Sequence, residues 1–149
     1  MRSVWIIRSS AIFGIAALLA CSTIIPYAPD SRMSQGEARK VIIRVFEEQP
    51  PNLRPRQIAI DDDAIRLGSE RFTQDIWTGA VAVVDRSDAF YLSSLKRPQL
   101  LKRNRRYQVL LSNTEGTVKR WVIFYDEQNA KRFLDALSSL AGFEGRGSL

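Results

Sequence analysis

Apolar side chains recur at helical spacing in a segment that begins near residue 34. They fall at i, i+3, i+4, i+7 and i+8, on Ala38, Val41, Ile42, Val45 and Phe46. This spacing predicts an amphipathic helix over 34–49 whose apolar stripe faces a core. Ser34 followed by Glu37 fits a capping box, so we expect the helix to begin there.

A second helical pattern lies near the end of the chain. Its apolar stripe comprises Ala130, Phe133, Leu134, Leu137 and Leu140. Asp126 is placed to cap this helix at its start, and Gly142 is expected to end it. Residues 143–149 then form a flexible tail, as chain termini commonly do.

Between the two helices the pattern changes to short runs rich in β-branched and aromatic residues. Candidate strands cover 57–60, 64–68, 80–85, 89–95, 106–112 and 117–125. Asp61-Asp62-Asp63 and Asn113-Thr114-Glu115-Gly116 separate neighbouring runs and are typical of turns. Short turns between consecutive strands favour an antiparallel sheet, so residues 34–142 are expected to form one α+β domain.

The stretch 105–140 runs from two hairpin strands directly into an amphipathic helix, and it resembles the end of a pleckstrin-homology-like domain. The resemblance rests on the order of the elements. It implies a strongly bent antiparallel sheet of about six or seven strands, with a C-terminal capping helix and the N-terminal amphipathic helix as an addition. It also implies binding of proteins or lipid headgroups without catalysis. A lipocalin-like or cystatin-like sheet is the competing architecture.

Residues 1–20 have the anatomy of a secretory signal peptide. Arg2 and Arg8 are the only charges there, an uncharged apolar stretch ends at Cys21, and no acidic residue precedes Asp30. The apolar run from Ser9 spans roughly 18 Å as a helix, whereas a hydrocarbon core is about 30 Å thick. A transmembrane anchor is therefore the less favoured interpretation.

Leu18-Leu19-Ala20-Cys21 resembles the lipobox of bacterial lipoproteins. The resemblance implies that the Cys21 thiol receives a diacylglycerol, that signal peptidase II cleaves between Ala20 and Cys21, and that a further fatty acid such as palmitate acylates the new amino group. The alternative is an ordinary signal peptide in which Cys21 is one more apolar residue. The chain has no second cysteine, so Cys21 cannot form a disulfide within the chain. An unpaired thiol is a liability in an oxidising compartment and lipidation consumes it, so the lone cysteine favours lipidation.

Lipidation also implies a location in the cell envelope. Residues 21–33 contain two prolines and are expected to form a lipidated tether that lifts the domain off the bilayer. Their apolar residues allow contact with the membrane or the domain instead. Ser22, not Asp, follows the cysteine. This resembles the pattern of outer-membrane lipoproteins, so the periplasmic face of the outer membrane is favoured over the inner membrane.

The residue inventory excludes most enzyme chemistry. The chain has no His and a single Cys, so it cannot build a Ser-His-Asp or Cys-His triad or a zinc site of Cys and His. We expect no enzyme, and a carboxylate-dependent hydrolase is the least favoured hypothesis. We expect no cofactor, and the only non-protein group expected is the covalent lipid on Cys21. We expect no metal, because the three aspartates at 61–63 are interpreted as a turn.

The net charge is +6, and its densest feature is a stretch of eleven residues without an acid. This stretch holds six basic residues: Lys96, Arg97, Lys102, Arg103, Arg105 and Arg106. The cluster predicts a surface for an anionic partner, either lipid phosphates or an acidic protein. A solvated loop between two strands is the alternative. An exported lipoprotein has no access to nucleic acid, so that partner is not expected.

Anchor, fold and charge together predict a non-catalytic envelope lipoprotein whose domain binds a protein partner or helps to assemble an envelope complex. The lipid anchor confines the domain to one membrane face, which raises its effective concentration for a neighbour. The alternative is a lipoprotein that binds lipid or glycolipid headgroups through its sheet and the basic cluster.

Overall fold

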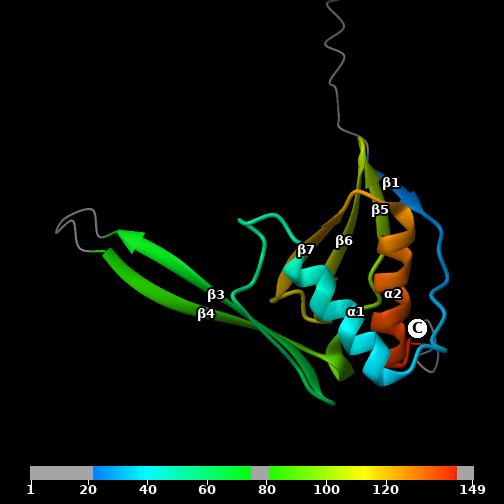
Figure 1. The fold of residues 1–149 in the computed structure, drawn as a ribbon, viewed down its shortest axis with the longest axis horizontal. Helices are drawn as coiled ribbons and strands as arrows, with labels where there is room; N and C mark the ends of the chain where they lie inside the picture. Colours follow the sequence, from blue (N-terminus) through cyan, green and yellow to red (C-terminus); the bar gives the residue numbers. More distant parts are fainter. Residues whose placement is uncertain (1–21, 75–80, 144–149) are drawn as a thin grey trace, which may run out of the picture.

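The computed structural model of the chain describes residues 22–74 and 81–143. These residues form seven strands, two α-helices and one short 3-10 helix (Figure 1). In chain order the elements are β1 (Thr23–Ile25), α1 (Gln35–Glu47), β2 (Gln57–Ile60), β3 (Ala64–Gln74), β4 (Val81–Tyr91), η1 (Leu92–Ser94), β5 (Leu100–Arg103), β6 (Arg106–Ser112), β7 (Lys119–Phe124) and α2 (Glu127–Ala141).

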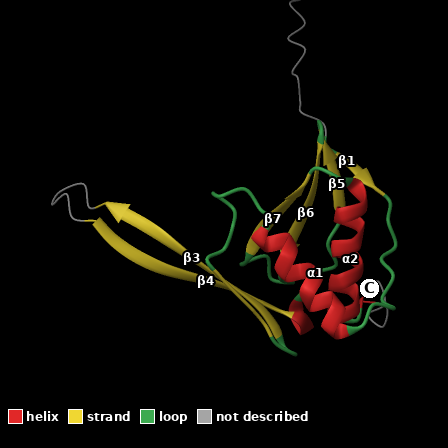
Figure 2. Cartoon of the chain, in the orientation of Figure 1, coloured by secondary structure: helices red, strands yellow, loops and turns green. Residues whose placement is uncertain are grey.

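The strands form two antiparallel sheets, with the orders β1-β5-β6-β7 and β2-β3-β4. Both helices cover one face of the four-stranded sheet, while the three-stranded sheet extends away from them (Figure 2). The predicted α+β class is confirmed. The expected single, strongly bent sheet is wrong, because the chain leaves β4 through η1 and β5 then pairs with β1 and β6 instead of β4.

Both helices begin and end as their sequences predict. The Ser34 hydroxyl accepts a hydrogen bond from the backbone N–H of Glu37 at 3.3 Å. The Asp126 carboxylate accepts one from the N–H of Asn129 at 3.0 Å. Gly142 ends α2 with φ at 61°, a left-handed conformation that favours glycine.

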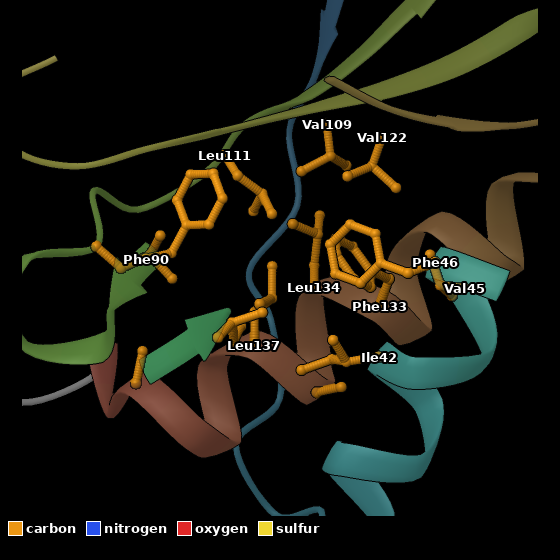
Figure 3. Close-up of a cluster of buried hydrophobic side chains, with 14 of the residues drawn as sticks. Ile42, Val45, Phe46, Phe90, Val109, Leu111, Val122, Phe133, Leu134 and Leu137 are labelled. Atoms are coloured by element: carbon orange, nitrogen blue, oxygen red, sulfur yellow. The ribbon is translucent and has the colours of Figure 1, made fainter. Parts of the chain in front are cut away.

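The apolar stripes of the helices are buried against the inner face of the four-stranded sheet (Figure 3). Phe133 of α2 lies between two other rings, with its centroid 6.0 Å from that of Phe46 and 5.4 Å from that of Phe124. Ile65 and Phe90, from the three-stranded sheet, belong to the same cluster. One core therefore holds both sheets together.

The hairpin over 57–68 with its aspartate turn is confirmed, as is the turn that joins β6 to β7. The two separate strands predicted over 80–85 and 89–95 are wrong in their bounds. Residues 81–85 and 89–91 belong to one continuous strand, β4, and residues 92–94 form η1. β5 was not predicted, because its basic residues are typical of a loop. Leu100 is nevertheless buried and lies opposite Val109 in β6, and this burial explains why the segment is a strand.

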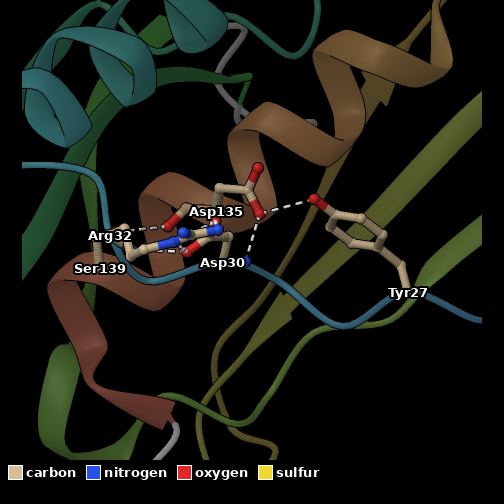
Figure 4. Close-up of polar contacts among 5 residues, drawn as sticks. All are labelled: Tyr27, Asp30, Arg32, Asp135 and Ser139. Carbon is tan, nitrogen blue, oxygen red and sulfur yellow. Dashed lines mark hydrogen bonds and ion pairs between the residues drawn. The ribbon is translucent and has the colours of Figure 1, made fainter.

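The segment before α1 lies along the domain, which is one of the alternatives to a tether that lifts the domain off the bilayer. β1 pairs with β5, and further along the chain the Tyr27 hydroxyl donates to Oδ1 of Asp135 at 2.8 Å. The backbone N–H of Asp30 donates to the same oxygen at 2.7 Å (Figure 4). Burial, followed by the bond to Asp135, raises the pKa of Tyr27 to about 12.

β3 and β4 form a long hairpin that continues beyond the body of the protein. They pair from Ala64–Tyr91 to Gln74–Val81, whereas β2 pairs with β3 only as far as Gly68. Beyond Gly68 no third strand of the described chain lies beside them. Residues 69–74 and 81–86, here called the arm, therefore project from the body as a two-stranded ribbon (Figure 1).

Candidate functional site

The six predicted basic residues do not form one patch, because β5 separates them. The backbone N–H of Lys96 donates to the carbonyl of Ser112 at 2.9 Å, at the end of β6 remote from Arg106. At about 3.4 Å per strand residue, these two ends of β6 lie roughly 20 Å apart. Lys96 and Arg97 thus precede β5 at one end of the sheet, and the other four residues gather at the opposite end.

The turn between β5 and β6 concentrates three guanidinium groups at that opposite end. Arg103 lies opposite Arg106, so Asn104 and Arg105 form a two-residue turn. Asn104 has φ at 56°, a left-handed conformation that Asn adopts more readily than most residues. With Gln108, these residues line a shallow, open groove of about 520 Å³. We call Arg103, Asn104, Arg105 and Arg106 the basic tip.

The arginines of the basic tip are exposed. Among the residues that the structure describes, none forms an ion pair with Arg103, Arg105 or Arg106. The Arg106 guanidinium lies 5.6 Å from the ring centroid of Tyr125, whose side chain is 67% exposed. A cation over an aromatic face keeps its charge, so the tip can attract an anion.

Lys102 lies next to the tip but faces a different environment. Its Nζ is 5.6 Å from the ring centroid of Tyr107, towards the start of α2. The Glu127 carboxylate accepts a hydrogen bond from Lys131, which holds its pKa below the usual range, with a smaller contribution from Lys102. Lys102 thus has a carboxylate nearby, whereas the described residues supply no ion-pair partner for the three arginines.

The outer face of the four-stranded sheet, turned away from the helices, carries exposed and partly exposed apolar side chains. In one row of this face Ile24 lies opposite Leu101, and Leu110 pairs with Trp121 in another. Ile24 is 55% exposed and Trp121 is 43% exposed. None of the four strands contains an Asp or Glu. An apolar surface free of negative charge therefore borders the basic tip.

Gln49 closes part of the free edge of this sheet at β7. Its Nε2 donates to the carbonyls of Ile123 and Val45 at 3.0 and 3.1 Å, and its Oε1 accepts from the N–H of Ile123 at 2.9 Å. The side chain is only 3% exposed. The amide occupies the place of a further strand, so this edge is protected from pairing with another chain.

A small cleft of about 170 Å³ lies between α1, α2 and the end of β7. Its charged residues are two arginines and two carboxylates: Arg44, Arg132, Glu48 and Asp126. Asp126 is already engaged as the cap of α2, and Arg132 pairs with Glu37 at 3.3 Å. The opposite charges balance, so the cleft has no excess charge with which to select an ionic ligand.

The acidic turn is held by its own hydrogen bonds and by arginines. The Asp61 carboxylate accepts from the N–H groups of Asp63 and Ala64 at 2.9 and 2.8 Å and pairs with Arg66. Asp62 pairs with Arg39. Within residues 22–74 and 81–143, no three His, Cys, Asp or Glu side chains gather in a group that could hold a metal ion.

Ala20 and Cys21, where the lipobox predicts cleavage and lipidation, lie outside the described residues. In the part of the chain that is described, no helix is long and apolar enough to cross a bilayer. The arm was missed by the sequence reasoning, although residues 80–85 were expected to be a strand. The signal that was available is the run Arg71-Phe72-Thr73, whose aromatic and β-branched residues suit its partner strand.

Comparison with known proteins gives no relative for this chain: no family model, no curated protein and no solved structure matches it.

Proposed function

We propose that this protein is a lipid-anchored, non-catalytic lipoprotein of the cell envelope whose arm binds a protein partner. The observation that carries the proposal is the arm itself. β3 and β4 remain paired from Ser69–Arg86 to Gln74–Val81, and no other described strand supports them there. An isolated two-stranded ribbon is only marginally stable in water, so a bound partner would stabilise it.

The arm also has the chemistry of a protein-binding element. In its register Phe72 lies opposite Val83, and Arg71 lies opposite Val84. Such aromatic and β-branched residues are enriched in strands that pack against another surface. Within residues 22–74 and 81–143, no strand pairs with either outer edge of the ribbon, and an unpaired edge is a template for adding a strand from another chain.

Lipidation of Cys21 supplies the second half of the function. Two or three acyl chains on one residue make membrane attachment effectively permanent, whereas a single chain gives only marginal binding. Confinement to one membrane face raises the effective concentration of the arm for a partner in the same envelope. Ser22 after the cysteine favours the periplasmic face of the outer membrane.

Lipid or glycolipid headgroup binding is the second candidate function. The three exposed arginines of the basic tip favour it, since guanidinium groups match phosphate geometry. Protein binding is preferred as the main function because the arm is the larger structural feature and no other described strand supports it.

Photo-crosslinking tests the arm. The full chain is produced in a bacterial host with a photoreactive residue at Thr73 in the arm or, as a matched control, at Thr114 in the β6–β7 turn. We expect one protein adduct from Thr73 and none from Thr114. The adduct protein, identified and purified, should bind the full chain at least tenfold more tightly than a variant that lacks the arm. Equal binding to both would overturn the proposal.

Mass spectrometry of the membrane fraction tests the anchor. We expect a mature chain that begins at Cys21 and carries a diacylglycerol and an amide-linked acyl chain. Cys21→Ser should remain unprocessed and unlipidated. A mature chain with a bare thiol, or a retained leader, contradicts the proposed anchoring.

A further inference from the structure

We propose that the basic tip contacts the phosphate groups of anionic phospholipids in the membrane that holds the anchor, and so fixes the orientation of the domain. Arg103, Arg105 and Arg106 are the contacting residues. The inference rests on the proposed lipidation of Cys21, and it adds which end of the domain faces the bilayer.

Strand register places the attachment point beside the tip. Thr23 lies opposite Lys102, and the antiparallel direction of β1 and β5 brings the residue before Thr23 level with Arg103. Cys21 precedes Ser22 in the chain, and consecutive Cα atoms are about 3.8 Å apart. A lipid on Cys21 would thus enter the bilayer within a few residue lengths of the three arginines.

The chain that follows the attachment point has little slack with which to lift the domain away. β1 pairs with β5. In the segment that follows β1, the Tyr27 hydroxyl and the backbone N–H of Asp30 both donate hydrogen bonds to the Asp135 carboxylate on α2 (Figure 4). If the segment between the attachment point and α1 were a flexible linker, the domain could adopt many orientations relative to the bilayer. A segment seated on the domain instead keeps the tip close to the bilayer surface.

Charge and side-chain type at the tip suit a phospholipid headgroup. Arginine donates two parallel hydrogen bonds to one phosphate, and the tip presents three exposed arginines around an open groove of about 520 Å³. The exposed ring of Tyr125 lies beside Arg106, and exposed Ile24 lies two residues beyond Ser22. Tyr is enriched at membrane–water interfaces, and apolar residues also enter them.

The far end of the sheet also has exposed basic residues, Lys96, Arg97 and Lys119. It differs from the tip because it carries an acid as well and lies far from the attachment point, and both differences favour a tip-down over a flat arrangement. The β6–β7 turn contains exposed Glu115, and it lies beyond Ser112 at the end of β6 remote from the tip. A domain that stands on its tip holds Glu115 away from the lipid. A domain that lies on the outer face of the sheet brings both ends to the membrane.

Orientation is tested in the lipidated protein. The full chain, purified with its acyl groups, is reconstituted into nanodiscs of phosphatidylcholine with phosphatidylglycerol. Because acylation consumes the thiol of Cys21, Asn104→Cys or Glu115→Cys provides a single site for a fluorophore. We expect a headgroup spin label to quench the fluorophore at 104 several-fold more than the one at 115. Equal quenching at both sites overturns the tip-down arrangement.

Charge recognition is tested without the anchor. The chain from residue 21 keeps every residue of the described core cluster, so this chain with Cys21→Ser is expected to fold. Arg103→Gln, Arg105→Gln and Arg106→Gln together should weaken binding to phosphatidylglycerol vesicles roughly 100-fold, at about fivefold per basic residue. The matched control removes the same charge at the far end, through Lys96→Gln, Arg97→Gln and Lys119→Gln, and should leave binding within about threefold.

The two triple variants separate this inference from the proposed function. Equal vesicle binding by both variants overturns the membrane contact, as does equal binding of the parent chain to neutral and anionic vesicles. If the tip variant loses the crosslinked protein partner but keeps vesicle binding, the tip binds an acidic protein and the inference fails. A bare Cys21 thiol contradicts the anchor, whereas the vesicle result still decides whether the tip recognises anionic lipid.

Discussion

The body and the arm of this protein contain similar antiparallel strands, but they are supported differently. β6 in the body lies between two other strands and under two helices, and Val109 and Leu111 on its inner face are fully buried. The arm has one strand beside each strand and no helix in the described chain (Figure 1). The same backbone pairing is therefore part of a core in one region and a free ribbon in the other.

The difference shows where the stability of the fold resides. Local opening requires little free energy where few apolar groups are buried, and it approaches the global unfolding free energy in the core. The body should thus determine the unfolding transition, while the arm should matter for binding. Substitutions at the centre of the body should therefore have the largest effect on unfolding.

Phe133→Ala should have the largest effect. The ring is fully buried and lies against both Phe46 and Phe124. Truncation leaves a cavity in the middle of the core, and such changes lower the free energy of unfolding by about 3–5 kcal/mol. Urea unfolding followed by circular dichroism measures the loss.

A matched control is Tyr125→Ala, which removes an aromatic ring that is 67% exposed. We expect a change within about 0.5 kcal/mol, as for most surface substitutions. A loss below about 1 kcal/mol for Phe133→Ala would show that α2 is not fixed on the sheet by this ring.

Gln49→Leu should have an intermediate effect. The substitution keeps an apolar stem but removes the amide that satisfies both the N–H and the carbonyl of Ile123. Leaving such buried groups unpaired costs about 1–3 kcal/mol. It also opens the edge of β7, so the variant should self-associate more readily in sedimentation experiments.

Gln128→Leu is the control for this substitution, because Gln128 is exposed on α2. It should change neither unfolding nor association. If the two variants behave alike, Gln49 does not protect the edge and the β7 strand is shielded in another way.

Tyr27→Phe should have a smaller, pH-dependent effect. Burial and the bond to Asp135 raise the pKa of Tyr27 from 10.0 to about 12. A pKa that is raised in the folded state contributes stability below pH 10 that is lost as the pH rises to about 12. Alkaline melts of the parent chain should therefore fall more steeply over this window than those of Tyr27→Phe. Parallel curves would contradict the bond between the Tyr27 hydroxyl and Asp135.

The elements that the sequence predicted correctly are those specified by residues close together in the chain. Both helices carry their caps and stripes within a few residues, and Ser34 and Asp126 make the expected bonds. The aspartate turn and the β6–β7 turn are equally local. These elements depend on neighbours along the chain, which a single sequence contains.

Elements that depend on distant partners were missed. β5 is a strand because Leu100 is buried opposite Val109 and β1 pairs on its other side, and its charges hide this pattern. The division into two sheets depends on where the chain leaves β4, which periodicity does not reveal. For the site, the basic residues were found in the sequence, but only the fold shows that Lys96 and Arg97 lie apart from the tip.

Removing the arm should have the smallest effect on stability, and this prediction tests the division between arm and body most directly. Ser69 and Arg86 lie opposite each other, so replacing residues 70–85 by Asn-Gly closes the hairpin with a favoured two-residue turn. Because no described strand other than its own partner pairs with either strand of the hairpin beyond Gly68, the free energy of unfolding should change by no more than about 0.5 kcal/mol. Partner binding should be lost.

A longer deletion, closed by the same Asn-Gly turn, should have a much larger effect on stability. Replacing residues 66–89 by Asn-Gly joins Ile65 to its partner Phe90 but removes Leu67, which is fully buried, and most of the partner strand of β2. This variant should lose at least about 3 kcal/mol, because it empties a core position. If the shorter deletion destabilises the protein as much as the longer one, the arm belongs to the cooperative body, and its role as a binding element loses its structural basis.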